Sequence, residues 1–335
     1  MLVMGGLLNR VALPGWSGKR ARSYTVFVAK AALAATILWI VLTNVGLSSL
    51  EESFSQTNAL LVLAAMVIWI LMTGFAAQRW RNVASAFDKA LTFRTTFIYT
   101  WVGLFVNLVL PALVGLDTVR TLQMRAQQVP IGEATRIIVT DRIYSFVSLL
   151  IVIAAGIPVA ASLSGSERVT QVMIIVVIFG SISFALLSKL YLLKKPLSRY
   201  PGANSIWKLS QDVHFISRNS RALLGVFVWA IGNHVGRVAA IVCLALALGI
   251  ELSAVEAFAL VPIASLIVLV PISLGGWGVR EVVYMEIFKL AGLTAASAVS
   301  LSILWGLVSL VMALLGGGVW MMQRKRVLPG TGKPC

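Results

Sequence analysis

Six long apolar runs dominate this 335-residue sequence, and they limit what it can fold into. Each run approaches or exceeds the roughly 20 residues that a helix needs to cross a membrane. Backbone N–H and C=O groups find no partners in lipid, so spans of this kind must be helical. The sequence therefore predicts an all-α, polytopic membrane protein with six full transmembrane helices, over residues 24–45, 58–78, 137–161, 169–192, 221–248 and 295–322.

The overall composition agrees with a lipid environment. Hydrophobic residues make up 59% of the chain and charged residues 12%, outside the range of ordinary soluble domains. The two cysteines, Cys243 and Cys335, lie far apart in sequence, so we expect neither a disulfide framework nor a metal site. No phosphate-binding loop, dinucleotide-binding glycine pattern or zinc-protease motif occurs, and we predict no cofactor.

The net charge of +16 has two interpretations. It could attract nucleic acid, but the basic residues gather in the loops between the apolar runs, as the positive-inside rule describes for cytoplasmic loops. We therefore expect an integral protein of a bacterial inner or plasma membrane, with both termini cytosolic and no nucleic-acid partner. The predicted cytosolic segments are a basic N-terminus over 1–23, a loop over 193–220 and a tail over 323–335. We expect no cleavable signal peptide.

Two further apolar stretches, 95–127 and 257–293, are broken by proline, glycine and charge. If each crossed the membrane twice, its halves would hold about 13–18 residues, which is marginal for a span. We predict that both are re-entrant helical hairpins, which enter the membrane and return to the same side.

The two broken stretches share an order of residues. LVLPALVGLDTVR and VLVPISLGGWGVR each place a proline nine residues before an arginine. Each stretch follows two spans and precedes one, which divides the membrane region into repeats over 24–161 and 162–322. Because three crossings per repeat is an odd number, the second repeat would be inverted, an arrangement found in many secondary transporters.

The broken stretches also carry candidate hinges and a candidate anion site. Proline ends a helix and glycine permits unusual backbone angles and close approach, so we predict structural hinges at Pro111, Gly115, Pro271, Gly275, Gly276 and Gly278. A helix that begins near Arg280 would point its positive end at an anion. The alternative is a plain helical break capped by glycine, with Arg280 reaching toward the interface and Glu281 stabilising the first turn.

Ionisable residues inside a membrane are costly and usually face the protein interior. The candidate substrate-binding residues on this ground are Asn107, Asp117, Arg120, Asp141, Arg142, Asn233, Arg237, Arg280 and Glu281. For Asp141 and Arg142 the alternative is a surface pair that marks the cytosolic end of a span. His234 shares a helical face with Arg237, and packing and function remain equally good interpretations of it.

These residues carry a resemblance to a known family. Asn107, Pro111, Gly115, Asp117 and Arg120, the pair Asp141 and Arg142, and the run P-x-x-x-G-G-x-G-x-R-E from Pro271 to Glu281 resemble the flippase-like, lysylphosphatidylglycerol synthase transmembrane-region family. The resemblance covers most of the chain. It implies movement of an anionic phospholipid or a polyprenyl-phosphate-linked sugar between leaflets. Synthases of this family also carry a soluble aminoacyltransferase domain, which this sequence does not contain, so we expect no lysyl transfer.

Three functional hypotheses follow from the sequence. The favoured one is translocation of an anionic lipid headgroup, without enzyme activity. The second is an integral-membrane transferase or phosphatase on a lipid-linked phosphate, with Asp117, Asp141 or Glu281 as acid, base or metal ligand. A neighbouring arginine lowers the pKa of a carboxylate, which suits ion pairing better than general-base catalysis. The third is a non-catalytic partner of a lipid-modifying enzyme such as a glycosyltransferase or synthase.

Overall fold

The fold was obtained as a computed structural model. It describes residues 32, 35–41, 43, 54–55, 57–109, 114–163, 167–193, 203–269 and 276–327, and every regular element in these ranges is helical. Five helices are long and apolar enough to span a membrane: Ala59–Ala86, Ile131–Ser162, Glu167–Leu193, Ser220–Ala247 and Ala295–Met322. They confirm five of the six predicted spans. The first predicted span, 24–45, lies mostly outside the described residues.

The spans belong to a chain of helices with short connections. The long ones are α4 (Ala59–Ala86), α7 (Ile131–Ser162), α8 (Glu167–Lys189), α11 (Ser220–Ala247) and α14 (Ala295–Val327). The shorter ones are α5 (Phe93–Val109), α6 (Val114–Ala126), η1 (Leu190–Leu193), α10 (Ala203–Arg218), α12 (Ala254–Val268), α13 (Val279–Phe288) and η3 (Lys289–Ala291). The hydrophilic loop predicted over 193–220 thus contains a 16-residue helix, α10.

Side-chain caps explain where several of these helices begin. The Asn58 carboxamide accepts from the Leu60 and Leu61 amides at the start of α4, and Asn219 accepts from Ala222 at the start of α11. At α12, Ser253 and Glu256 satisfy each other's backbone N–H groups in a capping box. Each cap supplies acceptors that the first turn of a helix otherwise lacks.

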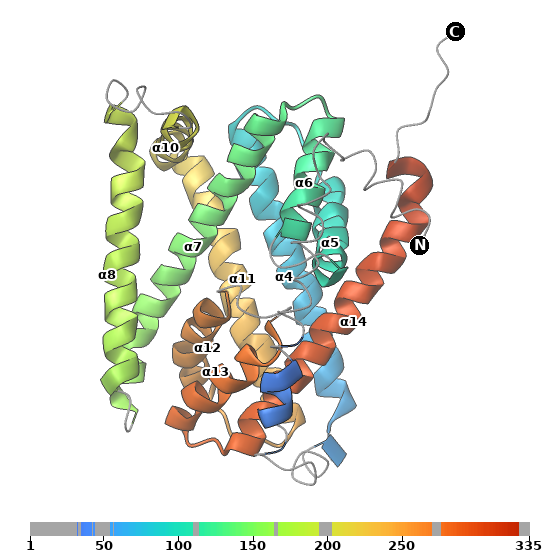
Figure 1. The fold of residues 1–335 in the computed structure, drawn as a ribbon, viewed down its shortest axis with the longest axis vertical. Helices are drawn as coiled ribbons and strands as arrows, with labels where there is room; N and C mark the ends of the chain where they lie inside the picture. Colours follow the sequence, from blue (N-terminus) through green and yellow to red (C-terminus); the bar gives the residue numbers. More distant parts are fainter. Residues whose placement is uncertain are drawn as a thin grey trace.

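The two broken stretches form pairs of short helices in opposite halves of the molecule. The pair α5 and α6 occupies the upper half of Figure 1, and the pair α12 and α13 the lower half. Helices α5 and α6 pack closely along their lengths, as do α12 and α13 to a lesser extent. Two short antiparallel helices therefore stand where each broken stretch was predicted.

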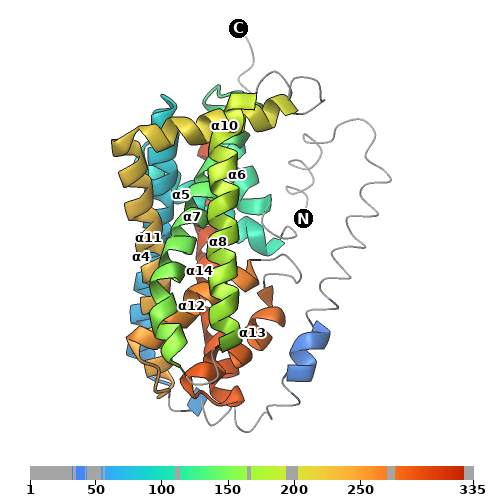
Figure 2. The ribbon, with the colours of Figure 1, turned by 90° about the vertical axis from the view of Figure 1, so that its left-hand side faces the viewer.

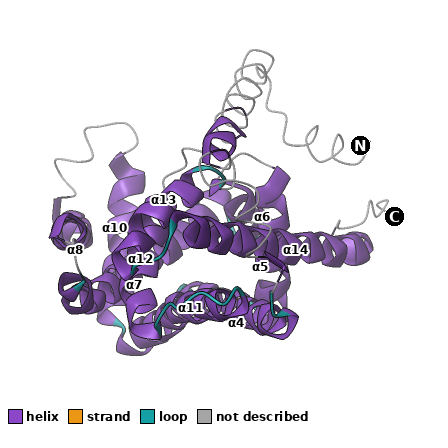
Figure 3. Ribbon diagram, turned by 90° about the horizontal axis from the view of Figure 1, so that it is seen from below, coloured by secondary structure: helices purple, strands orange, loops and turns teal. Residues whose placement is uncertain are grey.

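Long helices hold these pairs in place. Helices α4 and α11 run side by side along one side of the bundle, and α8 stands at its edge beyond α7, as the view along the long axis shows (Figure 3). Helix α10 lies across the end of the bundle, at a large angle to α8 (Figure 2). Met173 and Gly180 are the buried residues of α8, so most of this helix faces outward.

The core holds two large apolar clusters, one toward each end of the bundle, and a small third one made by Val41 and Val299. The larger joins the last turns of α11 with α12, α13 and α14, and includes Leu260, Phe288 and Leu301. The smaller joins the end of α4 with the start of α7 and with α10, and includes Trp80 and Ile216. Burying these side chains stabilises each end separately, and the polar residues of interest lie between the two clusters or beside them.

Candidate functional site: a line of buried arginines

Asp141 lies at the centre of a three-residue charge cluster. Its carboxylate accepts from Arg79 Nε at 2.8 Å and Arg79 Nη2 at 3.1 Å, and from Arg120 Nη1 at 3.3 Å. The Asp141 side chain is fully buried, and the two arginine side chains are 7% and 2% exposed. One carboxylate therefore joins α4, α6 and α7 in the interior.

Arg120 is held on more than one side. Its Nη2 donates to the Thr100 hydroxyl at 3.0 Å, which adds α5 to the same cluster. Its guanidinium also stacks over the Trp80 ring, 4.9 Å from the ring centroid. A cation over an aromatic face in a dry environment gains electrostatic attraction. The charge of Arg120 is therefore met within the protein, although its Nε is buried without a partner.

Asp117 and Arg142 pair with each other at 2.9 Å across α6 and α7. Both side chains are about one-third exposed, at 32% and 35%. The sequence neighbours Asp141 and Arg142 thus point to different partners, and Asp141 is not part of a surface pair. The acid and the arginine of α6 both bind residues of α7.

Asn107 and Gly115 make the contact between α5 and α6. The Asn107 carboxamide oxygen accepts from the Leu116 amide at 2.9 Å, in the first turn of α6. A Cβ on Gly115 would lie 2.7 Å from that same oxygen, which is closer than real contacts allow. Gly115 is helical, so close approach rather than an unusual backbone angle explains the glycine. Its neighbour Pro111 lies outside the described residues.

The start of α13 is already occupied by a protein carboxylate. Glu281 accepts from the Gly278 amide at 2.6 Å, from Arg280 Nη2 at 2.9 Å and from the Ser302 hydroxyl at 3.0 Å. Gly276 and Gly278 have φ values of +83° and +82°, which favour glycine. The helix tip predicted as an anion site therefore holds the chain's own anion. Pro271 and Gly275 lie outside the described residues.

Arg280 is enclosed by α14. Its Nε donates to Ser302 at 2.9 Å, and its guanidinium lies 4.6 Å from the centroid of the Trp277 ring. A Cβ on Gly306 would come within 2.7 Å of the Trp277 ring and 3.0 Å of the guanidinium carbon. Glycine at this point of α14 leaves the room that Arg280 occupies.

Arg237 differs from the other interior arginines. It lies on α11, and its guanidinium is 5.7 Å from the centroid of the Trp305 ring. Within the described ranges it makes no hydrogen bond or ion pair, and its Nε is buried without a partner. The Arg237 side chain as a whole is half-buried. Arg237 therefore combines an unmet positive charge with some access from outside.

Polar neighbours connect Arg237 to the charge cluster around Asp141 and to the one around Glu281. Tyr284 of α13 lies near both Arg237 and Arg280. On the other side, His234, one turn before Arg237, donates from Nε2 to the Ser145 carbonyl at 3.1 Å, and the Ser145 hydroxyl accepts from Arg79 at 2.9 Å. These contacts form a row of polar groups, which we call the polar line, that runs from one charge cluster to the other. Its members are Arg79, Ser145, His234, Arg237, Tyr284 and Arg280.

Asn233 takes part in packing. Its amide nitrogen donates to the Met72 carbonyl at 2.7 Å, which ties α11 to α4. A carbonyl inside a helix has a second lone pair for such a bond.

Arg79 is the residue that the sequence interpretation missed. The predicted span 58–78 ends just before it, which leaves Arg79 among the basic residues of the following loop. The helix continues to Ala86 and buries Arg79 together with Trp80 and Val83 on one face. The sequence holds no local signal for this contact, because Arg79 and Asp141 are 62 positions apart. Within the described ranges, no three His, Cys, Asp or Glu side chains group as metal ligands.

Comparison with known proteins shows the family to which the chain belongs. The family model described as the lysylphosphatidylglycerol synthase TM region matches residues 27–317, which include both helix pairs, four of the five spans and most of the fifth. The chain belongs to this family. It is therefore an integral membrane protein of a lipid-related family. No curated protein matches the chain.

Proposed function

We propose that this protein moves the headgroup of an anionic lipid between the two leaflets of its membrane, and that Arg237 contacts the headgroup phosphate. The observation that carries this proposal is the unmet charge of Arg237 near the middle of α11. An unpaired cation in a low-dielectric interior is costly unless it acquires a counterion. A lipid phosphate supplies that counterion with charge-assisted hydrogen bonds.

The arrangement of the helix pairs supports the proposal. We propose that α5–α6 and α12–α13 are re-entrant hairpins of an inverted repeat and enter the membrane from opposite sides. Their positions in opposite halves of the molecule agree with this arrangement (Figure 1). Each hairpin carries an arginine and an acid whose charges are met within the protein. In this proposal the paired residues stabilise the two helix pairs, and the unpaired Arg237, which lies between the two helix pairs, binds the substrate.

The lipid tails stay in the bilayer throughout. Only the headgroup enters the polar line. This line contains Arg237, Tyr284 and His234, and it ends at the charge clusters around Asp141 and Glu281. Asp141 and Glu281 repel a phosphate, while their arginine partners attract it. The carboxylates limit how tightly the headgroup binds at each end, and the Asp141 cluster keeps one net positive charge because two arginines share its single carboxylate.

A leaflet-exchange assay tests the proposal. Purified protein is reconstituted in vesicles that contain fluorescent lipids of matched tails, either anionic phosphatidylglycerol or zwitterionic phosphatidylcholine, and exchange is followed by quenching of the outer leaflet. We expect the anionic lipid to exchange at least tenfold faster than in protein-free vesicles. Exchange no faster than in protein-free vesicles for every headgroup would refute translocation.

The same vesicles separate translocation from catalysis. Mass spectrometry of the lipids after incubation, with a polyprenyl-phosphate-linked sugar included, detects any covalent change. We expect the lipid masses to remain unchanged. A new covalent product that depends on Asp141 or Glu281 would instead favour the transferase, although both carboxylates are held by arginines in the structure.

A further inference from the structure

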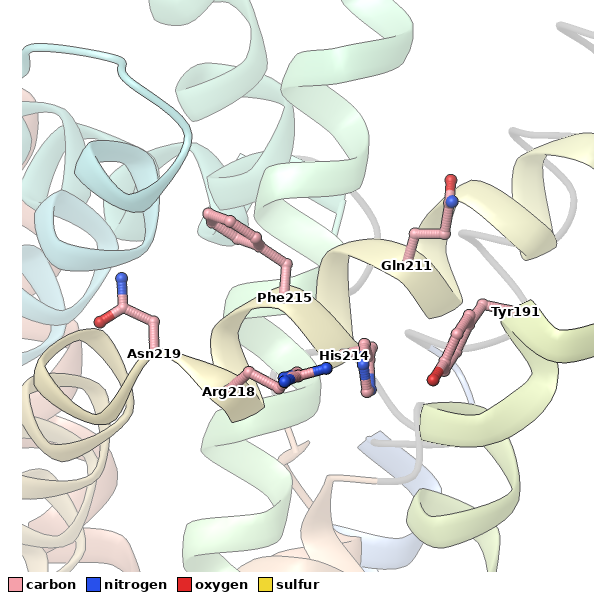
Figure 4. Close-up of a pocket in the computed structure, with 6 residues that line it drawn as sticks. All are labelled: Tyr191, Gln211, His214, Phe215, Arg218 and Asn219. Atoms are coloured by element: carbon pink, nitrogen blue, oxygen red, sulfur yellow. The ribbon is translucent and has the colours of Figure 1, made fainter.

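A hollow of about 510 Å³ lies at the end of the bundle that carries α10, away from the buried arginines. It is open on one side and lies where η1, α10 and the start of α11 meet. Its lining residues are Tyr191, Gln211, His214, Phe215, Arg218 and Asn219 (Figure 4). None of these residues belongs to the candidate translocation site.

The hollow carries a positive charge that no described acid cancels. The rings of Tyr191 and His214 stack at 4.2 Å between centroids, and Figure 4 shows the Arg218 side chain directed toward His214. Arg218 has no ion pair within the described ranges. The single acid of α10, Asp212, binds Arg136 of α7 at 2.8 Å. An anion is the ligand that this charge balance favours.

An exposed apolar face runs along α8, the helix that precedes Tyr191 in the chain. Ile175, Phe179, Ile182 and Leu186 are 64%, 72%, 54% and 68% exposed, and their spacing of four, three and four residues puts them on one face of the helix. Helix α8 leads directly into η1, whose Leu192 and Leu193 are 67% and 50% exposed. Hydrocarbon chains can lie against this face, with their headgroup at the level of Tyr191.

We propose that the hollow binds the headgroup of an anionic phospholipid, with Arg218 contacting the phosphate, Tyr191 and His214 forming one wall, and the acyl chains lying along α8. Helix α10 lies across the bundle end, as amphipathic helices do at a membrane surface (Figure 2). The charge bias predicts that this surface is the cytosolic leaflet, where anionic lipids attract basic side chains. The bound lipid fastens α10 and α8 to the membrane independently of translocation.

Native mass spectrometry of the full chain tests this site. The protein is released from detergent micelles that contain equal amounts of phosphatidylglycerol and phosphatidylcholine, and the lipids retained are counted. The test variant is Arg218→Gln. Lys208→Gln is the matched control, because Lys208 is an exposed cation on the same helix outside the hollow. Wild type should retain phosphatidylglycerol in preference.

We expect Arg218→Gln to weaken retention of phosphatidylglycerol about fivefold, the effect of one basic residue near an anionic surface, and Lys208→Gln to match wild type. Equal retention in the two variants overturns the proposal. So does displacement of the bound lipid by millimolar glycerol phosphate, which points to a soluble phosphate. A protein dimer that occupies the face without lipid and dissociates in Arg218→Gln also overturns it.

Discussion

The two helix pairs meet the charge of their arginines in different ways. In α5–α6, Arg120 pairs with Asp141 of α7, and Asp141 also holds Arg79 of α4. In α12–α13, Arg280 pairs with its sequence neighbour Glu281, and among the described residues Ser302 of α14 is the side chain from another helix that hydrogen-bonds to them. The first cluster connects four helices, whereas the second is nearly complete within one turn.

This difference gives the two ends different mechanical properties. A carboxylate shared between helices fixes their relative positions, because moving any one of them separates opposite charges in a dry environment. A local pair moves with its own helix and leaves neighbouring helices free. We infer that the α5–α6 end is the rigid one, and that α12–α13 moves more readily against the rest of the bundle.

The largest effect is expected for Asp141→Asn, which leaves both Arg79 and Arg120 without a countercharge. Breaking a buried ion pair from one side costs about 3–5 kcal/mol, and two orphaned arginines place this variant at the upper end. Thermal unfolding in detergent should show a large fall in Tm. A Tm within a few degrees of wild type would contradict the shared clamp.

A smaller loss is expected for Glu281→Gln, because only Arg280 loses its countercharge. We expect about 3 kcal/mol, at the lower end for a buried pair. The double variant Arg280→Met with Glu281→Leu removes both charges and should recover much of that stability. At the other end, Arg120→Met with Asp141→Leu should recover less, since Arg79 stays unpaired. Equal recovery of stability in the two double variants would contradict the proposed difference between the two ends of the bundle.

Gly306→Ala tests the packing around Arg280. Its Cβ would press on the Trp277 ring and the guanidinium, with Trp277 at 2.7 Å, and overpacking of this kind costs about 1–3 kcal/mol. Gly318→Ala is the matched control on the same helix, since nothing lies within 4 Å of its Cβ. The control should be neutral or slightly stabilised, as alanine favours a helix. Similar Tm values for the two variants would argue against close packing of α14 on Arg280.

The smallest effect is expected for Asp117→Asn. The Asp117–Arg142 pair is about one-third exposed, and exposed pairs contribute less than about 1 kcal/mol. The Tm should fall only slightly. At high salt it should fall even less, because screening already weakens the ion pair. A fall in Tm comparable with that of Asp141→Asn would show that this pair, rather than Asp141, joins α6 to α7.

Much of the fold was predictable because lipid imposes simple rules. Run length gave five of the described spans to within a few residues at most ends, and proline and glycine located both helix pairs. The extension of α4 to Ala86 and of α7 back to Ile131 was missed, since polar residues end a hydropathy run without ending a helix. Helix α10 was assigned to a loop because its amphipathic pattern lies outside any apolar run.

The site was predictable in its residue types but not in its pairing. Intramembrane charge pointed to Arg120, Asp141, Arg237 and Arg280; three of them are buried, and Arg237 is half-buried. Which carboxylate meets which arginine depends on how helices pack across the bundle, and this is absent from local spacing. Arg79 reaches Asp141 over 62 positions of sequence, so no short motif could have revealed the shared clamp or the isolation of Arg237.

The most direct measurement compares leaflet exchange of phosphatidylglycerol by Arg237→Gln and Arg168→Gln in identical vesicles. Arg168 is an exposed arginine at the start of α8, far along the chain from either helix pair, and controls for loss of one positive charge. Hydrogen bonds to a charged group are worth about 1.5–3 kcal/mol, so Arg237→Gln should slow exchange at least tenfold while Arg168→Gln matches wild type. Equal exchange by the two folded variants would contradict a role for Arg237 in carrying the headgroup.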